Sequence, residues 1–191
     1  LFVGFPPFVP PSPAVLTSLY GSEEFGSEKL IAYELGYRAQ PHERLSIDLA
    51  LFYNDYDELR SIELSAEPPD FTAFPPSINL NAGNKLRAQA YGGEIAATWR
   101  ATSWLRLQAN YSYLKLNASR IDGGNDGQSE LFAEGPSPEH QVSLHTSIDV
   151  ARNVEFDAIV RWVDELPALG IDPYLTLDLR IAWRPTENVE L

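Results

Sequence analysis

The stretch KLIAYELGYRAQPHERLSIDLALFYNDYD, residues 29–57, decides how the rest of the chain is interpreted. It holds two alternating runs of apolar and polar residues, and successive side chains of a strand point to opposite faces. One face carries Ile31, Tyr33, Leu35 and Tyr37 in the first run and Leu45, Ile47, Leu49, Leu51 and Tyr53 in the second. The polar residues 40–43 are of the kinds that favour a turn. The stretch therefore predicts a long β-hairpin with one apolar and one polar face.

The same alternation returns in later stretches of the chain. They are 91–99, 105–113, 142–150, 154–162 and 175–183, with Ile159 and Val163 as apolar departures on a polar side. The connections alternate in length, with short ones at 40–43, 101–103, 152–153 and 185–188 and long ones at 57–84, 116–137 and 164–172. Each strand of an up-and-down meander reverses direction. We therefore expect all the short turns at one end of the sheet and all the long connections at the other.

Aromatic residues gather beside the short turns. Trp99 and Trp104 flank one turn, Trp183 precedes another, and Tyr37 lies near a third. Membrane β-barrels carry aromatic girdles of this kind at the bilayer interfaces. An alternating run such as 45–53 rises about 26 Å, or about 20 Å at a tilt near 40°, which is close to the height of a barrel's apolar band. Pattern and length together favour a membrane β-barrel.

Several stretches of the chain together resemble one protein family. They are 27–38, 49–56, Gly92-Gly93-Glu94, 110–113, 138–141 and 177–185. In this order and spacing they resemble the middle-to-late barrel strands of TonB-dependent outer-membrane receptors, and the resemblance covers nearly the whole chain. It implies a parent barrel of roughly 22 strands that holds a plug domain. It also implies import of a scarce nutrient, most commonly a ferric siderophore, with energy delivered through TonB.

The expected fold class is all-β, an antiparallel up-and-down meander that forms a partial transmembrane β-barrel of about seven to eight strands cut from a larger barrel. Residues 1–28 are expected to form a Pro-rich and aromatic-rich extracellular loop, and residues 29–191 the barrel segment, with an eighth strand beginning after residue 188. The start shows no Met, basic segment or apolar signal segment, so we expect an excerpt of a longer protein. The expected location is the bacterial outer membrane.

The resemblance also implies the partners. They are the TonB complex, acting through a plug or N-terminal region that these residues lack, outer-membrane lipid and a small-molecule ligand such as a ferric siderophore. Nucleic acid is not expected, because the chain has 14 basic and 27 acidic residues and a phosphate backbone calls for a basic surface. The chain has no Cys, which excludes disulfides and thiolate metal sites.

Five aromatic residues in the Pro-rich loops are the candidate ligand-binding residues. They are Phe5, Phe8, Tyr20, Phe71 and Phe74. Loops often carry the binding residues of a protein. The alternative is that these side chains only pack against neighbouring loops.

No catalytic residue, cofactor or metal site is expected, and the chain is not expected to be an enzyme. There is no Gly-x-Ser-x-Gly elbow, phosphate loop or His-Glu-x-x-His sequence. The segment 122–127 approaches a calcium loop, but Gly124 occupies the third position and Ala133 the twelfth. His140 and His145 are five residues apart on a strand and point to opposite faces, so they cannot clamp a metal from one side.

The alternation also predicts which face each residue occupies. Near mid-membrane, Leu49, Ile95, Leu107, Leu144, Val160 and Leu179 are expected to face lipid, whereas Asp48, Glu94, Arg106, Ser143, Arg161 and Asp178 are expected to face the lumen. Together with Glu34, Arg38, Asp157 and Arg180, the lumen-facing charges are expected to pair along a wetted wall that holds the plug.

The alternative class is a soluble β-sandwich binding module for carbohydrate, with the aromatic loops as its site. The strands of a sandwich alternate in the same way. An outer-membrane barrel enzyme is a more distant third alternative.

Overall fold

A computed structural model of the chain describes residues 14–72, 74–126, 129 and 135–186. The chain divides into two compact units. The first comprises Leu1–Ile31, Asp55–Gln89 and Asn117–Ala133, and the second comprises Ala32–Asn54, Ala90–Leu116 and Glu134–Leu191. We describe each unit by itself.

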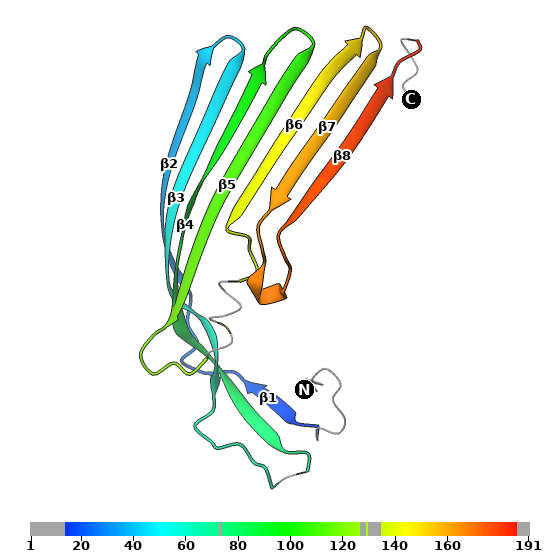
Figure 1. Ribbon diagram of the computed structural model, residues 1–191. Helices are drawn as coiled ribbons and strands as arrows, with labels where there is room; N and C mark the ends of the chain where they lie inside the picture. Colours follow the sequence, from blue (N-terminus) through cyan, green and yellow to red (C-terminus); the bar gives the residue numbers. More distant parts are fainter. Residues whose placement is uncertain (1–13, 73, 127–128, 130–134, 187–191) are drawn as a thin grey trace. The chain divides into compact units, whose positions relative to one another are not determined.

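The regular secondary structure of the described residues is almost entirely β-strand. The elements are β1 (Leu16–Tyr20), β2 (Lys29–His42), β3 (Leu45–Leu64), β4 (Ser77–Arg100), β5 (Leu105–Arg120), β6 (His140–Ala151), β7 (Val154–Val163), the 3-10 turn η1 (Pro167–Leu169) and β8 (Tyr174–Trp183). Strands β2 to β8 are neighbours in chain order (Figure 1), and the sheet is open. This confirms the predicted antiparallel meander. Among the described residues, no helix is long and apolar enough to cross a membrane.

The eighth strand of the sheet is not the one expected after residue 188, which lies outside the described residues. It is β1, which pairs in parallel with the start of β4, Leu16 opposite Ser77 and Tyr20 opposite Asn81. The segment 1–28, expected to be a loop, thus contains one short strand.

The short turns of the second unit lie at one end of its sheet. Backbone hydrogen bonds join neighbouring turns there: Arg100 N donates to Arg44 O, Asp149 N to Trp104 O and Arg184 N to Asn153 O, each at 2.8 Å. The loop that joins β7 to β8 starts at the opposite end, where Asp164 N donates to His140 O at 3.0 Å. The expected separation of short turns from long connections is confirmed for these segments.

The expected connection 57–84 is shorter in the structure, because β3 runs to Leu64 and β4 begins at Ser77. Glu58 has a φ of 55°, and beyond it the buried positions of β3 are Ser61 and Glu63. A residue in this conformation offsets the alternation by one position, as a β-bulge does. β3 therefore continues to Leu64, through residues that were expected to belong to the connection 57–84.

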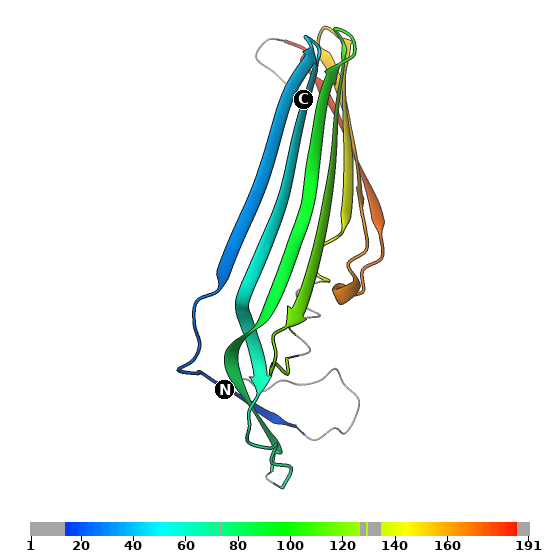
Figure 2. The same cartoon turned by 90° about the vertical axis from the view of Figure 1, so that its left-hand side faces the viewer.

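The registers of β5 to β8 confirm the two predicted faces. One row joins Leu107, Thr146, Ala158 and Leu179, and the next joins Gln108, His145, Ile159 and Asp178. The sheet of the second unit is a single layer (Figure 2), and its apolar side chains stay open, with Leu35 66 %, Leu179 62 % and Ile181 69 % exposed. No second sheet packs on this face among the described residues, which argues against the β-sandwich.

Candidate functional site

A network of polar side chains crosses β6, β7 and β8 on the polar face of the second unit. Asp157 is its centre: its Oδ1 lies 3.0 Å from His145 Nε2 and accepts from Ser147 Oγ at 2.7 Å, and its Oδ2 accepts from Arg180 at 2.9 Å. Ser147 Oγ lies 3.3 Å from the same Nε2 atom of His145. A Ser-His-Asp triad instead needs the serine and the aspartate on different ring nitrogens. The network therefore joins strands and does not form a nucleophile.

Further ion pairs extend this polar wall in the second unit. Arg184 donates to Glu155 at 2.8 Å, and Arg161 pairs with Asp178. Arg38 pairs with Asp48 between β2 and β3. All these pairs are at least partly exposed, so each contributes little stability, but together they hold charges of both signs in a regular array. The wall is suited to contact a polar surface or water.

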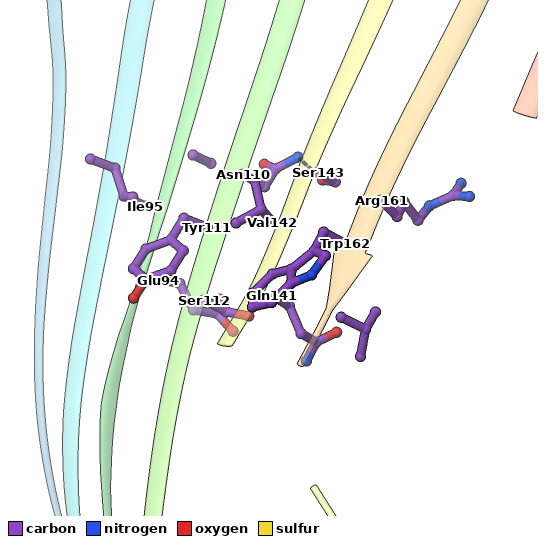
Figure 3. A pocket seen from close by; sticks show the side chains of 12 residues that line it. Glu94, Ile95, Asn110, Tyr111, Ser112, Gln141, Val142, Ser143, Arg161 and Trp162 are labelled. Carbon is purple, nitrogen blue, oxygen red and sulfur yellow. Dashed lines mark hydrogen bonds between the residues drawn. The ribbon is translucent and has the colours of Figure 1, made fainter. Parts of the chain in front are cut away.

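A shallow hollow of 380 Å³ lies in the second unit, with residues of β4 to β7 around it (Figure 3). Its polar lining includes Glu94, Arg161 and Asn110, whose amide donates to Ser143 Oγ at 3.1 Å. Two of these groups are already engaged, since Arg161 pairs with Asp178 and the Asn110 amide bonds to Ser143. The hollow is open, and no nucleophile paired with a base lines it, so the arrangement supports binding and not chemistry.

The first unit holds a larger hollow, with a volume of 740 Å³, between β3, β4 and the connections around them. Its lining mixes apolar and polar groups, and the polar ones include Glu24, Glu58, Glu63, Asn81 and Lys85. Glu63 is 6 % exposed; its Oε2 accepts from Asn125 N at 2.5 Å, and its Oε1 has no partner among the described residues. Sequence reasoning missed Glu63 because it placed this residue in the long connection 57–84. The alternation of Ser61 and Glu63 with Ile62 and Leu64 was the signal that could have placed it on a strand.

The segment 121–126 passes beside β4 and reaches β3 in the first unit. Ile121 N donates to Lys85 O at 2.9 Å. The last part of β3 extends past Lys29, where β2 begins. There, three alternate backbone amides of β3 donate to side chains: Arg60 N to Glu28 at 2.9 Å, Ile62 N to Asp126 at 2.5 Å and Leu64 N to Asn125 at 2.7 Å. Side-chain oxygens thus replace a neighbouring strand, which protects an edge that would otherwise be open to pairing.

This arrangement explains the segment that approaches a calcium loop. Two of its oxygen-bearing side chains, Asn125 and Asp126, serve as acceptors for β3 amides. No group of three or more His, Asp or Glu side chains in the described part of the chain could hold a metal ion. Asn125 and Asp126 therefore have a structural role at the edge of β3.

Replacing Asp126 with Ala is expected to loosen this segment. The change leaves the Ile62 amide without its acceptor at a position where Asp126 is 5 % exposed, and an unsatisfied buried donor costs about 1–3 kcal/mol. Hydrogen exchange of the 121–126 segment and of β3 beyond Glu58 should accelerate. Asp122→Ala is the matched control, because Asp122 is exposed; equal exchange in the two variants would contradict the assignment.

The structure places only some of the candidate ligand-binding residues. Phe5 and Phe8 lie outside the described residues. Tyr20 ends β1 and is 52 % exposed, whereas Phe71 and Phe74, in the connection between β3 and β4, are 71 % and 95 % exposed. None of these three lines the 740 Å³ hollow, so the structure does not bring them together with it.

The two strand histidines lie on opposite faces, as expected. His145 belongs to the polar network, whereas the ring of His140 stacks on Tyr111 and Tyr113, with centroids 6.0 and 5.0 Å apart. The Tyr111 hydroxyl lies 2.9 Å from His140 Nδ1. Each histidine is thus engaged by groups of its own face.

Comparison with known proteins gives one family and one fold. The sequence matches the family described as TonB dependent receptor-like, beta-barrel, over residues 4–191. The structure is similar to that of a mutant of the ferric enterobactin receptor PfeA of Pseudomonas aeruginosa bound to enterobactin, with a TM-score of 0.64 and 18% sequence identity. The match covers 90% of this chain and 26% of that chain. It is also similar to the ferric-catecholate import receptor Fiu of E. coli K12, with a TM-score of 0.61 and 19% sequence identity. This match covers 88% of this chain and 23% of that chain.

A third similar structure is the copper transporter OprC, with a TM-score of 0.60 and 13% sequence identity. The match covers 88% of this chain and 25% of that chain. The chain therefore spans about a quarter of the length of each of these proteins. At these identities the likeness concerns the fold alone.

Proposed function

Because the chain belongs to the TonB-dependent receptor-like β-barrel family, a family of outer-membrane transport proteins and not of enzymes, we propose that it serves the import of a scarce nutrient, namely a metal complex of the siderophore class. The observation that carries this proposal is the family match over residues 4–191. The similar structures include siderophore receptors and a copper transporter, which supports a metal or metal complex as the cargo.

The two faces of the second unit acquire roles in this proposal. The apolar face meets outer-membrane lipid, and the polar wall around Asp157 faces the lumen and contacts the plug. The short turns face the periplasm and the long connections face outward, as in outer-membrane barrels generally. The plug delivers the energy of the TonB complex; the chain contributes wall and loops.

We place the ligand contacts of this chain on the outward connections, at Tyr20, Phe71 and Phe74. Side chains as large and apolar as Phe71 and Phe74 are unfavourable in water when 71 % and 95 % exposed, and exposed aromatic groups are frequent anchors for ligands. The 740 Å³ hollow with Glu63 lies in the same unit and offers polar groups to a ligand.

Replacing both Phe71 and Phe74 with Ala tests this placement in the receptor that carries this chain. Truncating an aromatic anchor costs about 2 kcal/mol or more, so Kd for the imported ligand should rise about thirtyfold or more. The measurement is binding of candidate ferric siderophores to cells that produce the variant in iron-poor medium. The control is the double variant Phe71→Tyr, Phe74→Tyr, which keeps both rings. Unchanged binding in the Ala double variant would show that these residues are not part of the site. If the unaltered receptor bound none of the metal complexes, the proposed function would be rejected.

A further inference from the structure

A hollow of 170 Å³ lies in the second unit beside the short turn that joins β4 to β5, and it has no part in the import proposed above. Its lining includes Arg100, Thr102, Ser103, Arg106, Ser147 and Asp149. Arg106 lies opposite Ser147 in the register of β5 and β6, and Asp149 follows two positions later on the same polar face of β6. The hollow therefore holds charged and hydroxyl groups at the short-turn end of the polar wall.

The two arginines of this hollow lack the partners that other arginines of the polar wall have. Arg180, for example, pairs with Asp157 at 2.9 Å. The side chains of Arg100 and Arg106 form no ion pair or hydrogen bond with any residue that the structure describes. The carboxylate of Asp149 is likewise unpaired within the described part of the chain. The hollow thus contains two guanidinium groups and one carboxylate whose hydrogen-bonding capacity is unused.

The hydroxyl groups of the turn add neutral donors to this set. Thr102 Oγ1 accepts from Trp104 N at 3.3 Å, which leaves the proton of this hydroxyl free to donate. Ser103 is exposed, and its hydroxyl has no partner among the described residues. The N–H groups of a guanidinium form a planar fork that matches the oxygens of a carboxylate or a phosphate. Two forks and two hydroxyls supply more donors than the roughly four lone-pair sites of a carboxylate can accept, so they suit a phosphate better.

The carboxylate of Asp149 determines which kind of phosphate fits. An ionised carboxylate only accepts hydrogen bonds, so it repels an oxyanion that carries no proton. Sulfate and the phosphodiester of a lipid head group are anions of this kind at neutral pH. Inorganic phosphate keeps at least one P–OH group at neutral pH, and this group can donate to Asp149. The hollow therefore favours a phosphate that is still protonated over sulfate or a phosphodiester.

We propose that this hollow is a binding site for inorganic phosphate. Arg100 and Arg106 donate to the oxygens that carry no proton, because guanidinium groups form their strongest hydrogen bonds with charged oxygens. The hydroxyls of Thr102 and Ser103 donate to the same oxygens. Asp149 accepts the proton of the P–OH group in a hydrogen bond. All three charged side chains are exposed, so soluble phosphate can reach them.

Modification of arginines by phenylglyoxal measures whether an anion occupies this site. The receptor that carries this chain is purified in detergent and phosphate-free buffer and treated with the reagent, and the modification rate of each arginine is followed by mass spectrometry. Inorganic phosphate should slow the modification of Arg100 and Arg106 several-fold. Arg44 and Arg152 are internal controls, because both are exposed, belong to other short turns and do not line the hollow. Phosphate should leave their rates unchanged.

A comparison of anions tests the role of Asp149. Sulfate and dimethyl phosphate at the same ionic strength should protect the two arginines little, because neither anion carries a proton. Asp149→Asn replaces the carboxylate with an amide that can itself donate, so sulfate should then protect Arg100 and Arg106 about as well as phosphate does. Glu43→Gln is the matched control, because it changes an exposed carboxylate of a different short turn; this variant should still exclude sulfate.

Three results would overturn the proposal. Equal slowing at all four arginines would show only the screening of exposed charges. Protection of the unaltered receptor by sulfate as strong as that by phosphate would show that Asp149 does not select the anion. If Arg100 and Arg106 failed to react before any anion was added, another part of the receptor would cover them and the hollow would not be open to phosphate. None of these outcomes depends on which ligand is imported.

Discussion

Gly92→Ala is expected to prevent most of the assembly of the barrel that contains this chain. A Cβ atom at residue 92 would lie 2.0 Å from the backbone oxygen of Tyr113 and 2.9 Å from Cζ of Phe52. The Phe52 ring could rotate away, but the Tyr113 oxygen belongs to the neighbouring strand β5 and can move only if the strand moves. Overpacking of side chains alone costs about 1–3 kcal/mol, and a clash with backbone should cost more.

Gly36→Ala is the matched control for this change. Gly36 is also a strand glycine, and its added Cβ would meet only the backbone oxygen of Leu49, at 4.0 Å, which is ordinary contact. The measurement is the amount of heat-modifiable barrel in outer-membrane fractions. We expect normal assembly of Gly36→Ala and loss of most of the barrel in Gly92→Ala.

A second substitution identifies the atom responsible. The double variant Gly92→Ala, Phe52→Ala removes the ring but leaves the Tyr113 oxygen in place. It should assemble no better than Gly92→Ala alone. Recovery of assembly in the double variant would show that the ring, and not the spacing of β4 and β5, requires glycine at residue 92.

The Gly92 requirement shows what could and could not be predicted from the sequence. The stretch Gly92-Gly93-Glu94 was identified as part of the family pattern, but its physical reason needed coordinates, because the contact is made with a strand that follows about 20 residues later. Strand period, by contrast, is a local property. The faces of β5 to β8 followed from it directly, and the registers confirm them.

The first unit was harder to predict, because its structure depends on contacts between distant segments. Nothing in Leu16–Tyr20 indicates that it pairs with Ser77–Asn81, some 60 residues later. The amides of Ile62 and Leu64 need side-chain acceptors only because β2 begins as late as Lys29, and those acceptors, Asn125 and Asp126, come from another connection. The Pro-rich composition indicated where strands end, but it could not indicate that the alternation of faces along β3 shifts by one position at Glu58.

The ligand-binding role of the aromatic candidates stays a prediction. Aromatic composition pointed to Phe71 and Phe74, which are exposed in the structure. The hollow of the same unit is lined by none of these rings, and one of its polar groups, Glu63, is buried by its neighbours in space. Burial of a single carboxylate is a tertiary property, so no local pattern could show it.

The assignment of faces leads to the second large effect, which is expected from Leu107→Arg. Leu107 lies opposite Thr146 in the apolar row, and Gln108 lies opposite His145 in the polar row. Both residues are half-buried, so crowding does not distinguish them. An Arg on the lipid face near the midplane costs about 2–4 kcal/mol, whereas a lumen position tolerates charge.

In the receptor that carries this chain, Leu107→Arg should therefore reduce the heat-modifiable barrel in outer-membrane fractions far more than Gln108→Arg. An Arg at residue 108 would point toward the wall that holds His145 and Asp157, where a carboxylate is at hand to pair with it. The two changes introduce the same side chain at adjacent positions of one strand, so they differ only in the face that receives it. Equal assembly of the two variants would mean that the faces are reversed or that neither meets lipid, since a shift of one residue in register exchanges every side chain between the two faces.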